Sequence, residues 1–244
     1  MPVDGLDKII YRPVGMSPRK AKPETREALL EAARTLFLRQ GYTATGIDEI
    51  CAAAGITKGA LFHYFESKEA LGGAALERWV SDGLQAFGSG QYLNEPEPLK
   101  RALGLVDFAI EMSQIGPPGC LVGIFTQELA PSNQTVRTAC ADSFTVMRES
   151  FERLIAEAKA AHAPKAAFDA KSVAQHMLAV LQGSLILARA YQRPEIVAEH
   201  LRHFRDYLAS LFAAGAPAPT ETSRASGTGP RRTAPTTRRN HRRI

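Results

Sequence analysis

The sequence has few of the features that mark a disulfide scaffold, a metalloprotein or a membrane protein. Its three cysteines, Cys51, Cys120 and Cys140, are far apart, odd in number and form no Cys-x-x-Cys pair. This spacing excludes a disulfide framework and gives no support to a zinc ribbon. No apolar run approaches the length needed to cross a bilayer, and the N-terminus lacks the pattern of a secretory signal. We therefore expect a cytoplasmic protein with no membrane partner.

Motifs of catalysis are absent as well. The chain has no metal-spaced cluster of His, Cys and Glu, no Gly-rich phosphate loop and no Gly-x-Ser-x-Gly elbow. His162, His176, His200 and His203 lie in helical patterns without a nucleophile to pair with. We expect neither an enzyme nor a cofactor.

The chain has no net positive charge outside its C-terminal tail. The formal net charge is +5, but residues 216–244 hold seven Arg and a single acid, Glu221, so the rest of the chain has a charge of about −1. A near-neutral body argues against a protein covered in positive charge, such as a general chromatin packer. The tail consists mainly of Pro, Thr, Ser, Gly and Arg, and we predict that it is disordered. Its Arg pairs either raise non-specific DNA affinity through counterion release or form an extension without function.

Helical periodicity dominates what remains, and no strand-like alternation occurs. Residues 1–23 form a predicted flexible arm with a basic end at Arg19, Lys20 and Lys22. The remaining pattern predicts an all-α fold of about nine helices, at residues 24–40, 47–54, 58–65, 68–85, 98–114, 118–129, 133–162, 169–192 and 195–213.

Two short helices separated by Gly55 and preceded by a longer helix have the layout of a helix-turn-helix. The second short helix has about the length that fits a major groove with its N-terminal end at the base edges. Leu61 and Phe65 are expected to anchor it to the other helices. Thr45, Thr57 and Ser67 are placed to cap the three helices that follow them.

The run GYTATGIDEICAAAGITKGALFHYFESKEAL, Gly41–Leu71, resembles the N-terminal domain of the TetR family of bacterial regulators. The resemblance covers residues 24–71 closely, whereas the C-terminal half matches only in the number and length of its helices. It implies a helix-turn-helix domain at 24–71 that binds a double-stranded, palindromic DNA operator. Position by position, it implies phosphate contacts from Thr45, Tyr64 and Lys68, and groove contacts from Thr57, Lys58, Gly59, Ala60 and His63.

One position departs from the family. Phe62 stands where the family often has a Tyr whose hydroxyl touches a phosphate, so we expect the Phe62 side chain to pack against the protein instead.

Residues 72–215 are expected to form a helical domain for dimerisation and sensing. In the family, the last two long helices make the dimer interface, and the apolar stripes within 169–213 fit a homodimer. Gly183 and Ser184 would permit close approach of the two subunits there. The same stripes are also explained if they serve the subunit's own core.

The nature of the effector is open between two interpretations. Gly119–Val122, followed by Glu128 and Leu129, resembles a block of one TetR branch in which some members sense electrophiles or oxidants through a cysteine. Cys120 at a helix start, with Arg189 near it, would then be the sensor; a buried structural cysteine is the plainer alternative. The second interpretation is a small-molecule pocket, with candidate lining residues Phe108, Met112, Phe125, Phe144, Met147 and Met177, each also explained as core.

The sequence thus predicts a homodimeric, sequence-specific transcriptional regulator, most simply a repressor, released from its operator by a small molecule or by cysteine modification. The alternative is an architectural DNA-binding protein that uses its basic tail and ignores sequence. Deletion of residues 216–244 discriminates between the two, because only the architectural protein depends on the tail.

Overall fold

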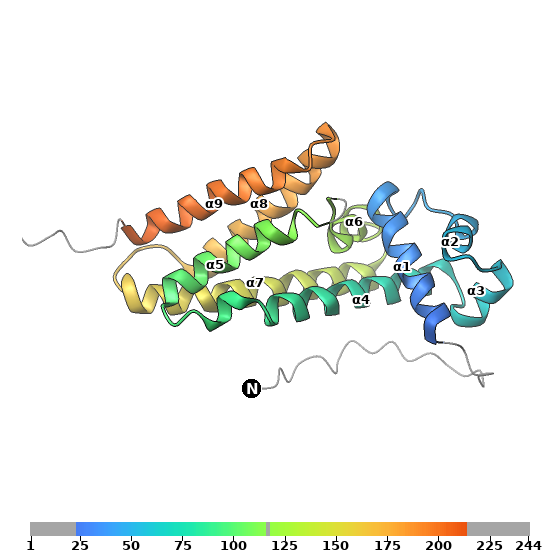
Figure 1. Ribbon diagram of the computed structural model, residues 1–244, viewed down its shortest axis with the longest axis horizontal. Coiled ribbons are helices and arrows are strands. Elements are labelled where there is room, and N and C mark those ends of the chain that lie inside the picture. The colour runs from blue at the N-terminus through green and yellow to red at the C-terminus, as the bar shows by residue number, and fades with distance from the viewer. Residues whose placement is uncertain (1–22, 116–117, 214–244) are drawn as a thin grey trace, which may run out of the picture.

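A computed structural model describes residues 23–115 and 118–213 of the 244-residue chain. These residues contain nine α-helices, one short 3₁₀ helix and no strand (Figure 1). The predicted all-α class is confirmed, and the predicted helices agree with the observed ones to within a few residues. The tail and all but the last residue of the expected arm lie outside the described residues. The helices are α1 (Pro23–Gln40), α2 (Ile47–Ala54), α3 (Lys58–Tyr64), α4 (Lys68–Gly88), η2 (Gln91–Asn94), α5 (Pro98–Met112), α6 (Leu121–Glu128), α7 (Gln134–His162), α8 (Ala170–Tyr191) and α9 (Glu195–Ala213).

Short polar side chains cap four of these helices, α3, α4, α7 and α8. The Thr57 hydroxyl accepts a hydrogen bond from the N–H of Ala60 at 3.2 Å, and the Ser67 hydroxyl accepts one from the N–H of Ala70 at 3.2 Å. Both caps were predicted. Gly41 and Gly55 end α1 and α2 with φ values of +92° and +67°, a backbone region that side chains with a Cβ rarely adopt.

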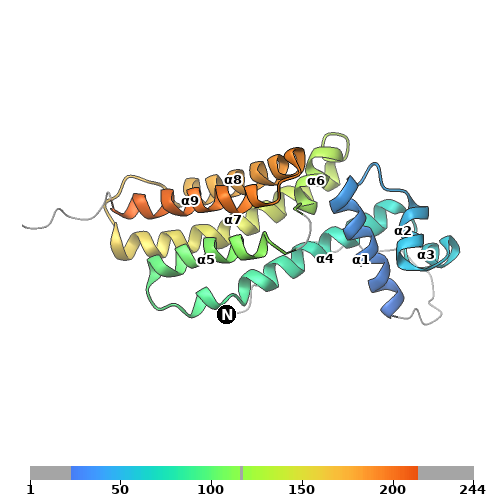
Figure 2. The same ribbon diagram turned by 45° about the horizontal axis from the view of Figure 1, so that its top comes forward.

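The molecule is elongated, with α1, α2 and α3 gathered at one end (Figures 1 and 2). α5, α7, α8 and α9 pack on one another along the rest of its length and surround one apolar core, which includes Phe151, Met177 and Leu201. A second apolar core lies under α1–α3 and includes Phe37, Ile50 and Leu61. α4 connects the two ends of the molecule.

The second core extends beyond the helix-turn-helix. Leu71, Ala75 and Leu76 of α4 are buried in it, as are Leu121 and Phe125 of α6. The expected boundary between residues 71 and 72 therefore falls inside a continuous helix. α6 is built into the same core as the three N-terminal helices, so a movement of α6 must act on them directly.

None of the helices in the described ranges is long and apolar enough to cross a membrane.

Candidate nucleic-acid interface

α3 presents an apolar side to the protein and its opposite side to solvent. Leu61 is fully buried and Phe65, which ends the helix, is 6% exposed, so these two residues fix α3 on the second core. The opposite side carries Lys58, Gly59 and His63, all exposed. The spacing of 58, 59, 62 and 63 places these positions on one side of a helix. The exposed surface of α3 therefore includes the lysine, the glycine and the histidine that the motif singled out.

Lys58 is held in place by α2. Its ammonium lies 3.1 Å from Oδ1 of Asp48 in the first turn of α2, and both side chains remain more than half exposed. An exposed pair of this kind contributes at most about 1 kcal/mol, so the lysine can exchange the carboxylate for another anion at low cost.

Two predictions for Thr45 are wrong. Gly46, not Thr45, is the N-cap of α2, and its N–H donates to Oε2 of Glu49 at 2.7 Å. Thr45 is 1% exposed, and its hydroxyl donates to the carbonyl of Gly41 at 2.6 Å. Because Thr45 closes the turn after α1 from inside, its side chain has no surface left for a phosphate.

Glu49 was not predicted to have a role, although a carboxylate three residues after a cap position is a known signal. The N–H of Gly46 and then the side chain of Gln40, whose Nε2 lies 3.1 Å from Oε2 of Glu49, hold the pKa of Glu49 below its usual value. The ionised carboxylate thus fastens the start of α2 to the end of α1.

The prediction for Phe62 is also wrong. Its side chain does not pack into the protein: the residue is 44% exposed, on the same side of α3 as Lys58 and His63. Leu61 and Phe65 already fill the inward positions of this short helix, so position 62 is left on the outer surface.

Lys68 begins α4 as expected, and its ammonium lies over the ring of Tyr42, 4.3 Å from the ring centroid. Burial lowers the pKa of Lys68, while the carboxylates of Glu69, Glu128 and Glu49 act in the opposite direction. Burial, with a smaller contribution from Glu69, raises the pKa of Tyr42 to about 12. Lys68 therefore stabilises the contact between α4 and the turn after α1, in addition to its expected contact with DNA. Tyr64 is half-buried at the end of α3.

α6 contacts the turn between α1 and α2 through its last residue. Oε2 of Glu128 accepts a hydrogen bond from the N–H of Thr43 at 2.7 Å. Behind this contact, the rings of Phe37, Tyr42 and Phe125 touch one another, with centroids 5.1–5.9 Å apart. The sequence showed Glu128 only as part of a motif, because a contact across 85 residues leaves no local signal.

Arg189 joins α8 to the end of α1. Its guanidinium donates a hydrogen bond to the backbone carbonyl of Leu38. This bond joins two residues that are 151 positions apart in the sequence. Gly119 lies against Leu38 as well, because a Cβ on this glycine would approach Cδ2 of Leu38 to 2.9 Å. Arg189 and Gly119 therefore both lie against Leu38 of α1, and the hydrogen bond of Arg189 goes to α1 rather than to Cys120.

Cys120 stands at the N-cap of α6, as expected, and is 9% exposed within the second core. Cys140 of α7 is 1% exposed in the same core. Burial raises the pKa of Cys140, a hydrogen bond with Thr126 lowers it, and the nearby thiol of Cys120 raises it. The two cysteines are therefore neighbours, and both thiols are free.

The predicted pocket-lining residues are not gathered around one cavity. Phe125 and Phe144 belong to the second core, whereas Met147 and Met177 belong to the first. Phe108 contacts Phe87 and Tyr92, with ring centroids 5.2 and 5.7 Å apart. Met112, the sixth of these residues, ends α5.

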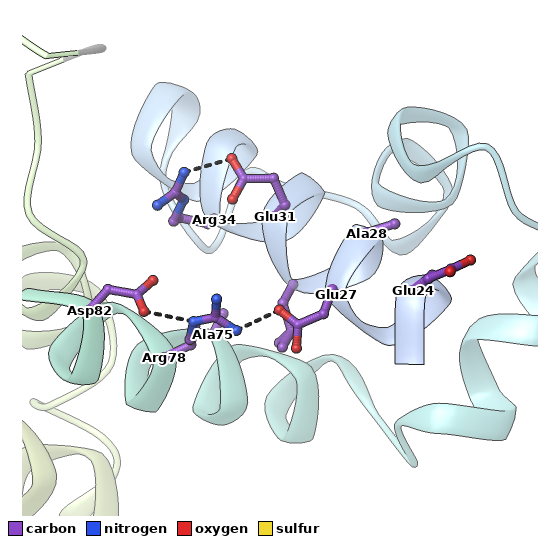
Figure 3. Close-up of a pocket in the computed structure, with 9 residues that line it drawn as sticks. Glu24, Glu27, Ala28, Glu31, Arg34, Ala75, Arg78 and Asp82 are labelled. Atoms are coloured by element: carbon purple, nitrogen blue, oxygen red, sulfur yellow. Dashed lines mark hydrogen bonds and ion pairs between the residues drawn. The ribbon is translucent and has the colours of Figure 1, made fainter. Parts of the chain in front are cut away.

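Two of the surface hollows formed by the described residues stand out, and neither is lined by any of these six residues. The first, of about 440 Å³, lies between α1 and α4 (Figure 3). Arg78 bridges Glu27 at 2.5 Å and Asp82 at 2.7 Å across its floor, and Arg34 pairs with Glu31 at 2.6 Å. Of these ion pairs, Arg78–Glu27 joins α4 to α1, whereas Arg34–Glu31 lies within α1 and Arg78–Asp82 within α4.

The second hollow, of about 420 Å³, runs between α8 and α9. A Cβ on Gly183 would meet open space there, whereas Ser184 is buried and donates to the carbonyl of Leu181 at 2.8 Å. Large apolar side chains are exposed around it on the same two helices: Ile186, Leu187, Tyr191 and Tyr207. Such a surface is typical of an interface with another protein.

Within the described parts of the chain, no group of three or more His, Cys, Asp or Glu side chains is arranged to hold a metal ion.

Comparison with known proteins identifies both halves of the chain. Residues 29–75 match the family of bacterial regulatory proteins named after TetR, and residues 98–204 match the tetracyclin repressor-like C-terminal domain. The transcriptional repressor DhaR of Mycobacterium sp. (strain GP1) is 30% identical over 166 residues, which cover 68% of this chain and 83% of DhaR.

Solved structures of two regulators superpose on this chain. The regulatory protein TetR of Rhodobacter sphaeroides superposes with a TM-score of 0.67 at 25% identity, covering 75% of this chain and 98% of that one. The reduced form of NemR from E. coli superposes with a TM-score of 0.62 at 25% identity, covering 75% and 96%. The family models together span more than half of the sequence, with the helix-turn-helix in the first. The chain belongs to the TetR family of bacterial regulatory proteins.

Proposed function

We propose that this protein is a homodimeric transcriptional repressor that reads a palindromic operator with α3. The outward side of α3 carries the proposal, since it exposes Lys58 and His63 and is fixed from behind by Leu61 and Phe65. A helix of this kind enters the major groove with its N-terminal residues at the base edges. DhaR and NemR are both named as repressors, which favours repression rather than activation by this protein. The proposed DNA contacts are Thr57, Lys58, Gly59, Ala60, His63, Tyr64 and Lys68.

DNA binding is tested with the full-length protein on the DNA that flanks its own gene, first by footprinting and then by fluorescence anisotropy. A Lys58→Ala variant should bind the footprinted site at least fivefold more weakly, because a good base contact is worth about 1–3 kcal/mol. Lys165→Ala is the matched control, since Lys165 is exposed in the loop after α7, at the end of the molecule away from α3 (Figure 1). Equal losses in the two variants would contradict the role of α3.

The second copy of the chain is proposed to dock on α8 and α9, within residues 169–213. A two-fold dimer is what a palindromic operator requires, because each subunit reads one half-site. The exposed apolar side chains around the second hollow would be buried in this contact. Analytical ultracentrifugation should show a dimer for the wild type and a monomer for Leu187→Glu. A Leu187→Glu protein that remains a dimer would place the interface elsewhere.

Release from DNA is proposed to pass through α6. Glu128 contacts the turn after α1, and Arg189 contacts the end of α1, so both connect the C-terminal helices to the helices that carry α3. Cys120 begins α6 within the same core. A group added to its thiol has no room there and must displace α6, which would favour a conformation that no longer matches the operator.

The probe is N-ethylmaleimide. The thiol of Cys120 adds across the C=C bond of the maleimide, so that an S–C bond forms and the thiol proton ends on the neighbouring carbon. If Cys120 is the sensor, the reagent releases wild-type protein and the Cys140→Ser variant from the operator but not Cys120→Ser. If Cys120→Ser is released equally, Cys120 is not the sensor and the trigger lies elsewhere in the chain. A non-covalent ligand against Phe108, Met112, Phe125, Phe144, Met147 or Met177 would then require the helices to separate first.

A further inference from the structure

An exposed aromatic ring lies in the middle of the proposed DNA-reading surface. Phe62 is the single large hydrophobic residue that is strongly exposed within residues 24–88, all of which the structure describes. Its neighbours on the outer side of α3 are Lys58, Gly59 and His63. Isolated exposed apolar residues are common on protein surfaces, so the location of Phe62, rather than its exposure alone, carries the inference.

The chemistry of the ring restricts what it can contact in DNA. Phenylalanine has neither a hydrogen-bond donor nor an acceptor, so it cannot bind a phosphate oxygen as a tyrosine hydroxyl does. On the major-groove edges of the four base pairs, the C5-methyl group of thymine is the one apolar feature. A ring on the groove-facing side of α3 therefore gains most by covering a thymine methyl.

The position of Phe62 along α3 restricts where this thymine lies. Phe62 follows Lys58 by one turn, which is about 6 Å along the helix axis. Neighbouring base pairs are about 3.4 Å apart. The thymine therefore lies no more than about two base pairs from the base pair that Lys58 reaches. A two-fold dimer repeats it in the other half-site.

We infer that Phe62 is a specificity-determining residue that recognises the methyl group of one thymine in each operator half-site. This inference rests on the proposed function, because it requires α3 to enter the major groove. It adds a base preference that hydrogen-bonding residues of α3 do not supply. Phe62 also contributes nothing to the core, so it can be replaced without unfolding the protein.

The test replaces each thymine of the operator, one symmetric pair at a time, with deoxyuridine, which lacks only the methyl group. Binding of the full-length protein is measured by fluorescence anisotropy. At one pair of positions, the wild-type Kd should rise about fifteenfold, since burial of one methyl group is worth a factor of about four and two half-sites contribute. Phe62→Ala should bind the thymine and deoxyuridine duplexes equally. Phe62→Leu, which keeps an apolar side chain, should retain part of the difference.

Lys58→Ala is the matched control on the same side of α3. It should weaken binding to every duplex while keeping the preference for thymine. Two results would overturn the inference: no deoxyuridine substitution changes the wild-type Kd, or Phe62→Ala keeps the full preference. If the protein binds no duplex in a sequence-specific way, the proposed function fails first, and this is seen before any thymine is replaced.

Discussion

Gly72 and Gly73 are adjacent in α4, so the same Gly→Ala substitution at each position tests how tightly α1, α4 and α6 pack together. Gly72 is buried, and a Cβ there would lie 2.8 Å from Cε2 of Tyr42 and 3.4 Å from Cζ of Phe125. Gly73 faces open space. Both lie inside α4, where replacing Gly by Ala stabilises a helix by about 0.8–1.0 kcal/mol. Only the surroundings of the added methyl group differ.

The packing cost at Gly72 is large because the ring of Tyr42 cannot move freely. Phe37 and Phe125 hold it on two sides, each with its centroid 5.1 Å away. Overpacking a core of this kind costs about 1–3 kcal/mol. Gly73→Ala should therefore raise the free energy of unfolding, and Gly72→Ala should be about 1–3 kcal/mol less stable than Gly73→Ala.

Thermal unfolding followed by circular dichroism measures the difference. For a domain of this size, 1 kcal/mol corresponds to about 2–4 °C in Tm, so the two variants should differ by at least about 2 °C. Gly72→Ala should also bind the operator more weakly, because displacement of Tyr42 moves the turn between α1 and α2. If Gly72→Ala is as stable as Gly73→Ala, the tight contact of α4 with Tyr42 and Phe125 does not exist and the reasoning is refuted.

Three further predictions concern other contacts. Glu128→Gln should leave the fold intact but lower operator affinity or the response to N-ethylmaleimide, since the charge that binds the N–H of Thr43 is lost. If operator binding and its release by N-ethylmaleimide are both unchanged, Glu128 does not connect α6 to the DNA-binding helices. Arg78→Ala should leave the free energy of unfolding in urea close to that of wild type, because its ion pairs are half exposed; a clear drop in the urea midpoint would show that these pairs are not ordinary surface pairs. Burial acts to raise the pKa of Glu97, but hydrogen bonds from the N–H groups of Leu99 and Lys100 and from His162 outweigh it and lower the pKa. Glu97 is the N-cap of α5. The stability that its ionised carboxylate contributes is complete above the ordinary glutamate pKa of about 4.3 and is lost as the pH falls through the lowered pKa. Urea titrations at pH 7 and pH 3 should therefore show Glu97→Gln less stable than wild type at pH 7, with a smaller difference at pH 3.

The sequence predicts most of the fold because its signals are local. Apolar residues at three- and four-residue spacing mark the helices, and Thr57 and Ser67 mark two of their starts. Thr45 was assigned to the wrong position because its neighbour Gly46 caps α2 through the backbone and Glu49. A capping threonine and a threonine that closes the preceding turn look alike in sequence, since both precede a helix by one or two residues.

Most exposed positions of α3 were predictable from the sequence, but the contacts that join α1 and its following turn to α6 and α8 were not. Lys58, Gly59 and His63 follow from the motif and the helix period. The exposure of Phe62 does not, because a phenylalanine in a short helix is usually buried, and Leu61 and Phe65 already fill the inward positions. The contacts of Glu128 and Arg189 span 85 and 151 residues, and no local pattern reports contacts of that range.

The most direct test of the account is one titration of the footprinted operator and a scrambled duplex of equal length with the full chain and with a chain that lacks residues 216–244. If α3 reads the operator in a dimer, both proteins bind the operator as two subunits per duplex and prefer it over the scrambled sequence. If binding is equal on the two duplexes and is lost with the tail, the tail binds DNA without regard to sequence, and the account of α3 is contradicted.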